Sequence, residues 1–99
     1  MKLFVIIASI LGGLGVAAGA FGAHGLEDKL DAEMLEVWET AARYQMYHAV
    51  ALFGASWLIQ QTGSGWATAG AASFVGGVLI FSGTLYILAI SGVRWLGAI

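Results

Sequence analysis

The 99-residue chain contains no cysteine and no proline, and only 10% of its residues are charged. Without cysteine it can form no disulfide, no thiol nucleophile and no cysteine-ligated zinc or iron–sulfur centre. A soluble domain carries nearer ~25% charged residues, which keep its large surface hydrated. Because 60% of the residues are hydrophobic, we expect most of the outer surface to meet lipid rather than water.

Positive charge is scarce in particular, with four Lys and Arg residues against six acids. The net charge of −2 argues against nucleic acid as a partner, since binding phosphates requires Lys and Arg. Eight of the ten charged residues fall between residues 27 and 43, and only Lys2 and Arg94 lie elsewhere. The lipid bilayer is therefore the first expected partner.

The first apolar run covers residues 3–23. At about 1.5 Å of rise per residue, a helix of this length crosses a hydrocarbon core of ~30 Å. A secretory signal peptide is the alternative, because Lys2 followed by an apolar stretch and small residues fits that pattern too. The run exceeds a typical signal core, so we expect a retained transmembrane span.

The charged segment that follows has a helical period of 3.6 residues, with its acids on one face and apolar residues on the other. It predicts an acidic amphipathic helix over about 31–43, with Asp31 as its N-cap. No glycine or proline separates this helix from a second apolar span over about 44–60. A polar turn then leads into a third span over about 66–91, antiparallel to the second. The expected fold is an all-α membrane protein, a single integral domain over 1–99.

Glycine is abundant, with 15 residues, and it recurs at three- and four-residue spacing in two of the spans. Transmembrane helices associate where small residues let their backbones approach closely. The predicted packing positions are Gly12, Gly15, Gly19 and Gly22 in the first span, and Ser73, Gly76, Gly77 and Gly83 in the third. We expect these two ridges to pack on each other or on an identical neighbour. The alternative is that glycine is simply commoner in membrane helices.

A second set of residues forms a candidate polar cluster. Tyr44, Gln45 and His48 lie within about one turn of the second span, and His24 ends the first. Polar groups inside a membrane usually face protein and often serve function. His24 and His48 could simply bond neighbouring helices, handle a proton, or ligate haem or a metal. We assign no cofactor or metal from the sequence.

No catalytic triad, paired-carboxylate cleft or phosphate loop is present, so we expect no enzyme. All six acids lie outside the predicted spans, which argues against an ion-driven transporter. Two hypotheses remain. One is a structural or accessory subunit that packs onto a larger membrane complex or onto itself. The other is a small oligomeric channel or carrier lined by Gln45 and His48, with Ser73 and Thr84.

Three stretches together resemble a known family. They are GAFGAHGL at 19–26, WETAARYQMYHA at 38–49 and GVLIFSGTLY at 77–86. Their order and spacing resemble the DUF423 family of small bacterial inner-membrane proteins, of the YgdD/YwdK type. The resemblance implies a multi-pass protein of the bacterial inner membrane and includes His24, Gln45 and His48 in the family pattern. The family's usual fourth span, after the position of Ile99, is missing here, which we expect to matter for any function of a closed four-helix bundle.

The distribution of Lys and Arg predicts an orientation. Lys2 lies before the first span, whereas Lys29, Arg43 and Arg94 lie on the other side of the membrane in the predicted topology. The positive-inside rule then places the acidic segment and the end of the third span in the cytoplasm, with the N-terminus outside.

Overall fold

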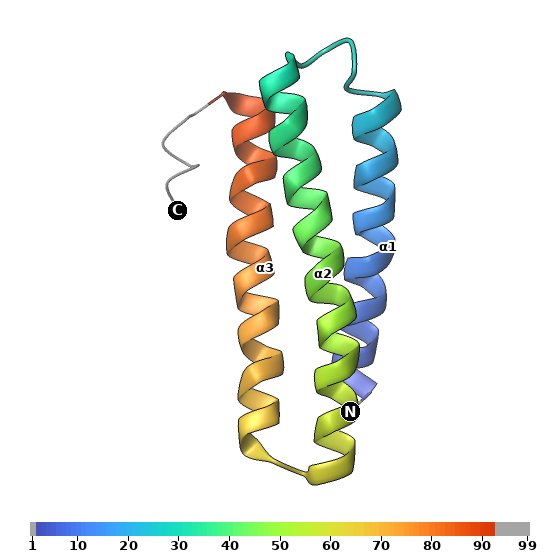
Figure 1. Cartoon of the computed structure of the whole chain (residues 1–99), viewed down its shortest axis with the longest axis vertical. Helices are drawn as coiled ribbons and strands as arrows, with labels where there is room; N and C mark the ends of the chain where they lie inside the picture. The colour runs from blue at the N-terminus through green and yellow to red at the C-terminus, as the bar shows by residue number, and fades with distance from the viewer. Residues whose placement is uncertain (1, 93–99) are drawn as a thin grey trace.

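The computed structural model describes residues 2–92, which form three α-helices. Helix α1 covers Lys2–His24, α2 covers Ala32–Thr62 and α3 covers Gly65–Ser91. Consecutive helices run in opposite directions, so that α1 and α3 point the same way, with α2 between them (Figure 1). The prediction of an all-helical fold is confirmed for these residues.

Two of the described helices, Leu3–His24 and Gly65–Ser91, are long and apolar enough to cross a membrane. The predicted acidic helix and the predicted second span form one continuous helix, α2. With 31 residues α2 is about 46 Å long. Its acids lie towards its beginning, so its hydropathy changes along its length from polar to apolar.

Local sequence explains where α2 and α3 begin and end. Asp31 is the N-cap of α2 as predicted, and its side chain accepts a hydrogen bond from the backbone N–H of Met34 over 2.8 Å. Gly63 ends α2 at φ 65°, a left-handed conformation that costs glycine little. Ser64 then caps α3 through the N–H of Trp66. This tight turn makes α2 and α3 antiparallel neighbours.

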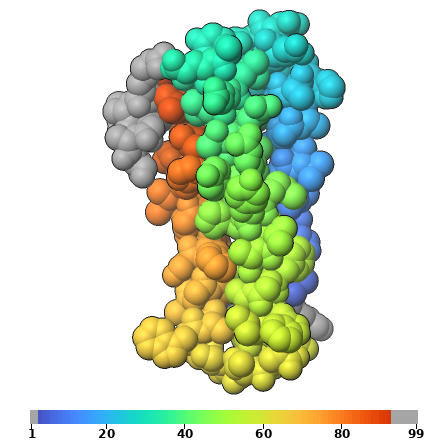
Figure 2. Space-filling view, in the orientation of Figure 1, coloured from blue at the N-terminus to red at the C-terminus, as the bar shows by residue number. Residues whose placement is uncertain are grey.

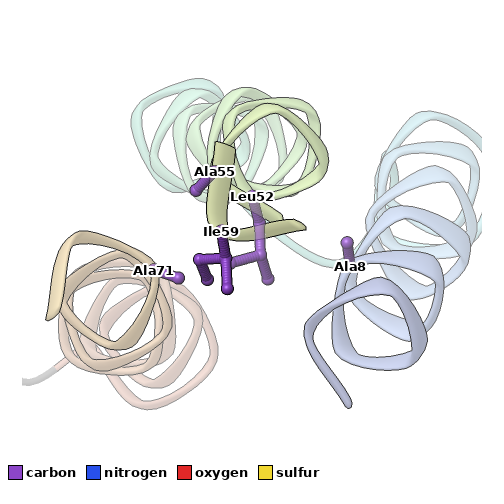
Figure 3. Packing of buried hydrophobic residues seen from close by; sticks show 5 residues of the cluster. All are labelled: Ala8, Leu52, Ala55, Ile59 and Ala71. Atoms are coloured by element: carbon purple, nitrogen blue, oxygen red, sulfur yellow. The ribbon is translucent and has the colours of Figure 1, made fainter. Parts of the chain in front are cut away.

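Helix α2 is the centre of the bundle, and its buried side chains reach both neighbours. Leu52 and Ile59 point into the space between Ala8 of α1 and Ala71 of α3, next to Ala55 (Figure 3). Leu52, Ala8 and Ala71 have no exposed surface. On the opposite side the outer face of α2 stays open along its whole length (Figure 2). The bundle is therefore an open arrangement in which α1 and α3 both pack on α2.

This arrangement corrects one prediction. The glycine ridges of α1 and α3 do not pack on each other within the chain, because α2 packs along both helices. Three of the α1 glycines approach α2 instead. Packing on an identical neighbour, the other expectation, stays a prediction. Arg94 and Trp95, which we expected at the membrane boundary, lie outside the described residues.

Candidate functional site

Gln45 joins all three helices. It projects from α2, is only 7% exposed, and uses both atoms of its amide group. Its Nε2 donates to the backbone carbonyl of Leu11 in α1 over 2.8 Å. Its Oε1 accepts a hydrogen bond from the hydroxyl of Tyr86 in α3 over 2.7 Å. The amide thus satisfies its polar atoms inside the bundle and links the helices to one another.

Trp38 makes an equivalent contact two turns earlier in α2. Its Nε1–H donates to the carbonyl of Ala18 in α1 over 2.7 Å. Its ring lies 4.6 Å from the ring of Tyr86, and the edge-to-face neighbour Phe21 lies 6.1 Å away. Trp38, Gln45 and Tyr86 therefore form one connected group, called below the Trp–Gln–Tyr cluster.

Two glycines make room for this cluster on α1. A Cβ atom added at Gly22 would lie 2.5 Å from Cδ1 of Trp38, and one added at Gly15 would lie 2.6 Å from Sδ of Met46. Both distances are shorter than real Cβ contacts allow. The absence of a side chain at these positions lets Trp38 and Met46, the residue next to Gln45, approach the backbone of α1.

A third bond fixes α3 to α2. Ser82 is 2% exposed, and its hydroxyl donates to the carbonyl of Ala41 over 2.8 Å. Every buried side-chain nitrogen and oxygen in the described part of the chain has a hydrogen-bond partner. The polar groups between the helices thus stabilise the bundle and are not left open towards a ligand.

The structure separates the predicted polar cluster. Gln45 turns inwards, whereas the Nδ1–H of His48 donates to the carbonyl of Tyr44 on its own helix over 2.7 Å. The rings of Tyr44 and His48 lie against α3, 5.3 Å from Phe81 and 6.1 Å from Phe74, respectively. His24 is exposed at the end of α1. The Tyr44–His48 pair and Gln45 therefore serve different contacts.

The predicted packing positions also divide into two groups. Gly12, Gly15 and Gly22 face α2, although Gly12 has ordinary space, with the Cβ of Ala49 at 3.9 Å. The others are open: a Cβ atom at Gly19, Gly76, Gly77 or Gly83 would meet nothing within 4 Å. The hydroxyl of Ser73 bonds only to the carbonyl of Ala69 in its own helix.

An apolar groove runs between α1 and α3 beside the Trp–Gln–Tyr cluster. One hollow of about 400 Å³ is lined by Leu14, Ala17, Phe21 and the cluster itself. A second hollow of about 190 Å³ continues it along α3 past Val78. In residues 2–92 no three His, Cys, Asp or Glu side chains are grouped to hold a metal ion.

Sequence reasoning missed Trp38 and Tyr86 as partners of Gln45. In the sequence both residues stand out only as members of the motifs at 38–49 and 77–86. One signal was available: Trp38 and Gln45 are seven residues apart, as are Gly22 and Gly15. Matching intervals on two neighbouring helices predict repeated contacts along one seam.

The model of the family described as "Protein of unknown function (DUF423)" matches residues 18–99. The chain belongs to this family. Over its full length it is 44% identical to the UPF0382 membrane protein YwdK of Bacillus subtilis, of which it covers 81%. It is 44% identical to a UPF0382 membrane protein of Staphylococcus saprophyticus, covering 82% of it, and 46% identical to one of Staphylococcus haemolyticus, covering 80%.

The resemblance to DUF423 that the sequence motifs indicated is thus confirmed. The names of these relatives, together with two apolar helices of spanning length, identify this DUF423 chain as a membrane protein. The relatives' names assign no reaction. No solved structure matches the chain.

Proposed function

We propose that this DUF423 chain is a non-catalytic, multi-pass protein of the bacterial inner membrane that acts as a structural or accessory subunit. It docks through its open helix faces onto a larger membrane complex or onto copies of itself. The observation that carries this proposal is the use of its interior polar groups. Gln45, Ser82 and Trp38 all bind other helices of the same chain.

The direction of the helices supports three crossings of the membrane. Helices α1 and α3 have spanning length and point the same way. A chain that crosses twice in one direction must cross back between the two passages, and only α2 lies between them. In this arrangement the acidic start of α2 and the linker before it extend beyond the hydrocarbon, at the end where positive-inside counting puts the cytoplasm.

The outer surface supports docking. Large apolar side chains are exposed on all three helices, among them Leu14 at 58%, Val50 at 65% and Ile80 at 58%. Lipid alone satisfies such surfaces, but the open glycines Gly76, Gly77 and Gly83 on α3 also permit close approach of another helix. A docking protein needs room at these positions, and a Cβ atom added at any of the three glycines would meet nothing within 4 Å.

The same contacts weigh against a channel or carrier lined by Gln45 and His48. A residue that lines a solute path offers its polar atoms to the solute. Both polar atoms of Gln45 are already bonded, and His48 bonds its own helix. Breaking the Gln45 bonds for each passing solute would loosen the contacts between the three helices.

The test is extraction of native membranes in mild detergent, native gel separation and mass spectrometry of the co-migrating proteins. A variant with Gly76→Leu and Gly83→Leu fills the open face of α3, and Ile80→Leu is the matched control on an already large side chain. Stoichiometric co-migration that the double variant loses and the control keeps would support the proposal. A chain that migrates alone as a monomer would overturn it.

If the chain migrates as a homo-oligomer without other proteins, a second measurement is needed. Solute flux through the protein in liposomes then distinguishes a subunit from a channel. A homo-oligomer that carries no solute supports docking onto copies of itself. Solute flux that disappears in His48→Ala would overturn the subunit proposal in favour of the channel.

A further inference from the structure

Helix α1 contacts α2 through two equivalent units that lie seven residues apart. In each unit a side chain of α2 donates to a carbonyl of α1: Gln45 to Leu11 and Trp38 to Ala18. In each unit, the residue four positions after the acceptor is a glycine: a Cβ atom at Gly22 would meet the ring of Trp38, and one at Gly15 would displace the flexible end of the Met46 side chain. A pair of glycines with a spacing of seven therefore lies at the contact of α1 with α2, and Gly22 is the one that a rigid ring requires.

Helix α1 carries a second pair with the same spacing, three residues earlier. Gly12 and Gly19 repeat the interval of Gly15 and Gly22. The observed packing does not require them, because a Cβ atom at Gly19 would meet nothing within 4 Å and one at Gly12 only Ala49 at 3.9 Å. Alanine would fit at both positions and is the better helix former.

The screw symmetry of a helix connects the two pairs. Moving α1 along its axis by three residues, about 4.5 Å, and turning it by about 60° superposes its backbone on itself. Gly12 and Gly19 then stand where Gly15 and Gly22 stood. The carbonyls that face Gln45 and Trp38 become those of Ala8 and Gly15. Both donors thus keep an acceptor, and no new Cβ atom meets Trp38 or Met46.

We propose that α1 has two registers on α2, the observed one and one shifted by three residues towards its C-terminal end. This inference goes beyond the proposed subunit role and does not depend on it. Shifts of one helix past another, from about 1–2 Å up to about one turn, are a known form of two-state movement. The shift would also move Leu11 and Leu14, which line the groove between α1 and α3, and would so reshape that groove.

Three contacts favour the observed register, the first being the edge-to-face contact of Phe21 with Trp38, since the shift would put Ala18 in the place of Phe21. Leu26, in the linker after α1, is 7% exposed and packs in a cluster with Trp38 and Ala89. A shifted α1 pushes Leu26 out of this site. Val5 would also replace the smaller Ala8, which has no exposed surface. The shifted register is therefore the minor one, and Gly25 with the turns that follow it must absorb the movement.

The chain has no cysteine, so disulfide trapping in proteoliposomes can measure both registers. In the observed register the Cβ positions of Gly12 and Ala49 are 3.9 Å apart, within the range of a disulfide. The pair Gly12→Cys with Ala49→Cys reports this register. After the shift Ser9 occupies the place of Gly12, so Ser9→Cys with Ala49→Cys reports the other.

Val16→Cys with Ala49→Cys is the matched control. Ser9 and Val16 are exposed and flank Gly12 by about one turn on either side. Undirected fluctuation of α1 would bring both to Ala49, whereas the proposed shift brings only Ser9. We expect the intramolecular Ser9 disulfide to form several times faster than the Val16 disulfide under the same oxidant. Equal rates would overturn the proposal.

Two alanine substitutions bias the equilibrium in opposite directions. Gly22→Ala clashes with Trp38 only in the observed register, so it should raise the rate of the Ser9 disulfide by roughly fivefold or more. Gly19→Ala clashes only in the shifted register, so it should reduce that rate to the Val16 level. Gly19→Ala leaves the Gly12 disulfide unchanged, which shows that the variant still folds. A Ser9 rate insensitive to Gly19→Ala would also overturn the proposal.

Discussion

The hydroxyl of Tyr86 donates to Oε1 of Gln45 over 2.7 Å, across a separation of 41 residues in the sequence. The same amide group holds Leu11 through its nitrogen. One side chain of the middle helix thus connects the two outer helices, which share few direct contacts because α2 lies between them. The first predictions test how much this connection stabilises the bundle.

Removing the bond between Gln45 and Tyr86 should lower stability in a coupled way. A double-mutant cycle with Gln45→Leu and Tyr86→Phe should give a coupling free energy of about 0.5–1.5 kcal/mol, the range for hydrogen bonds between membrane helices. Thermal unfolding in detergent, followed by tryptophan fluorescence, measures it. Additive effects of the two substitutions would mean that the bond contributes nothing to the folded bundle.

Gly22→Ala and Gly19→Ala should differ although they are one turn apart. The added methyl group at Gly22 meets the ring of Trp38, and such overpacking costs about 1–3 kcal/mol of unfolding free energy. At Gly19 it meets nothing, so helix propensity alone should leave stability equal or raise it by up to about 1 kcal/mol. The same unfolding measurement compares them, and equal losses would contradict the described seam.

His48→Ala should cost much less than Gln45→Ala. The hydrogen bond of His48 returns to its own helix at Tyr44, whereas the bonds of Gln45 connect three helices. We expect a loss below about 0.5 kcal/mol for His48→Ala and about 1–3 kcal/mol for Gln45→Ala, which also removes buried volume. A larger loss of stability for His48→Ala than for Gln45→Ala would show that His48, rather than Gln45, stabilises the contacts between the helices.

The proposed three crossings place the two ends of α2 on opposite sides of the membrane. Single cysteines at Asp28 and Ser64, introduced into the cysteine-free chain, should react with a membrane-impermeant maleimide from opposite sides of sealed vesicles. The positive-inside rule predicts the cytoplasmic side for Asp28. Labelling of both positions from the same side would show that α2 does not cross.

Local signals in the sequence predicted the elements well. Asp31 followed by an acidic first turn gave the start of α2, and the polar turn before Trp66 gave the break between α2 and α3. These features depend on neighbours in the chain, so a single sequence carries them. The 3.6-residue period of hydrophobic residues likewise predicted helices, because helix formation also depends on residues close together in the chain.

The arrangement in space was less predictable. A helical wheel puts Tyr44, Gln45 and His48 within about 100° of one another, and this sector is wide enough to face two different helices. Only the position of α2 between α1 and α3 decides that Gln45 faces inwards while His48 lies against Phe74. The glycine ridges had the same ambiguity, since spacing predicts a close approach but does not identify the helix that approaches.

The long sequence separations in the Trp–Gln–Tyr cluster set an order for biosynthesis. Helix α1 is synthesised before the residues that bond to it, because Trp38 and Gln45 follow their acceptors by 20 and 34 residues. At roughly 5–20 residues per second, the donors follow their acceptors by on the order of seconds. Gln45 bonds to Leu11 of α1, which is made before it, and to Tyr86 of α3, which is made after it. The bond from Tyr86 that completes the link between the three helices can form only once α3 has been made, whereas the glycine face of α1 needs only α2 to cover it.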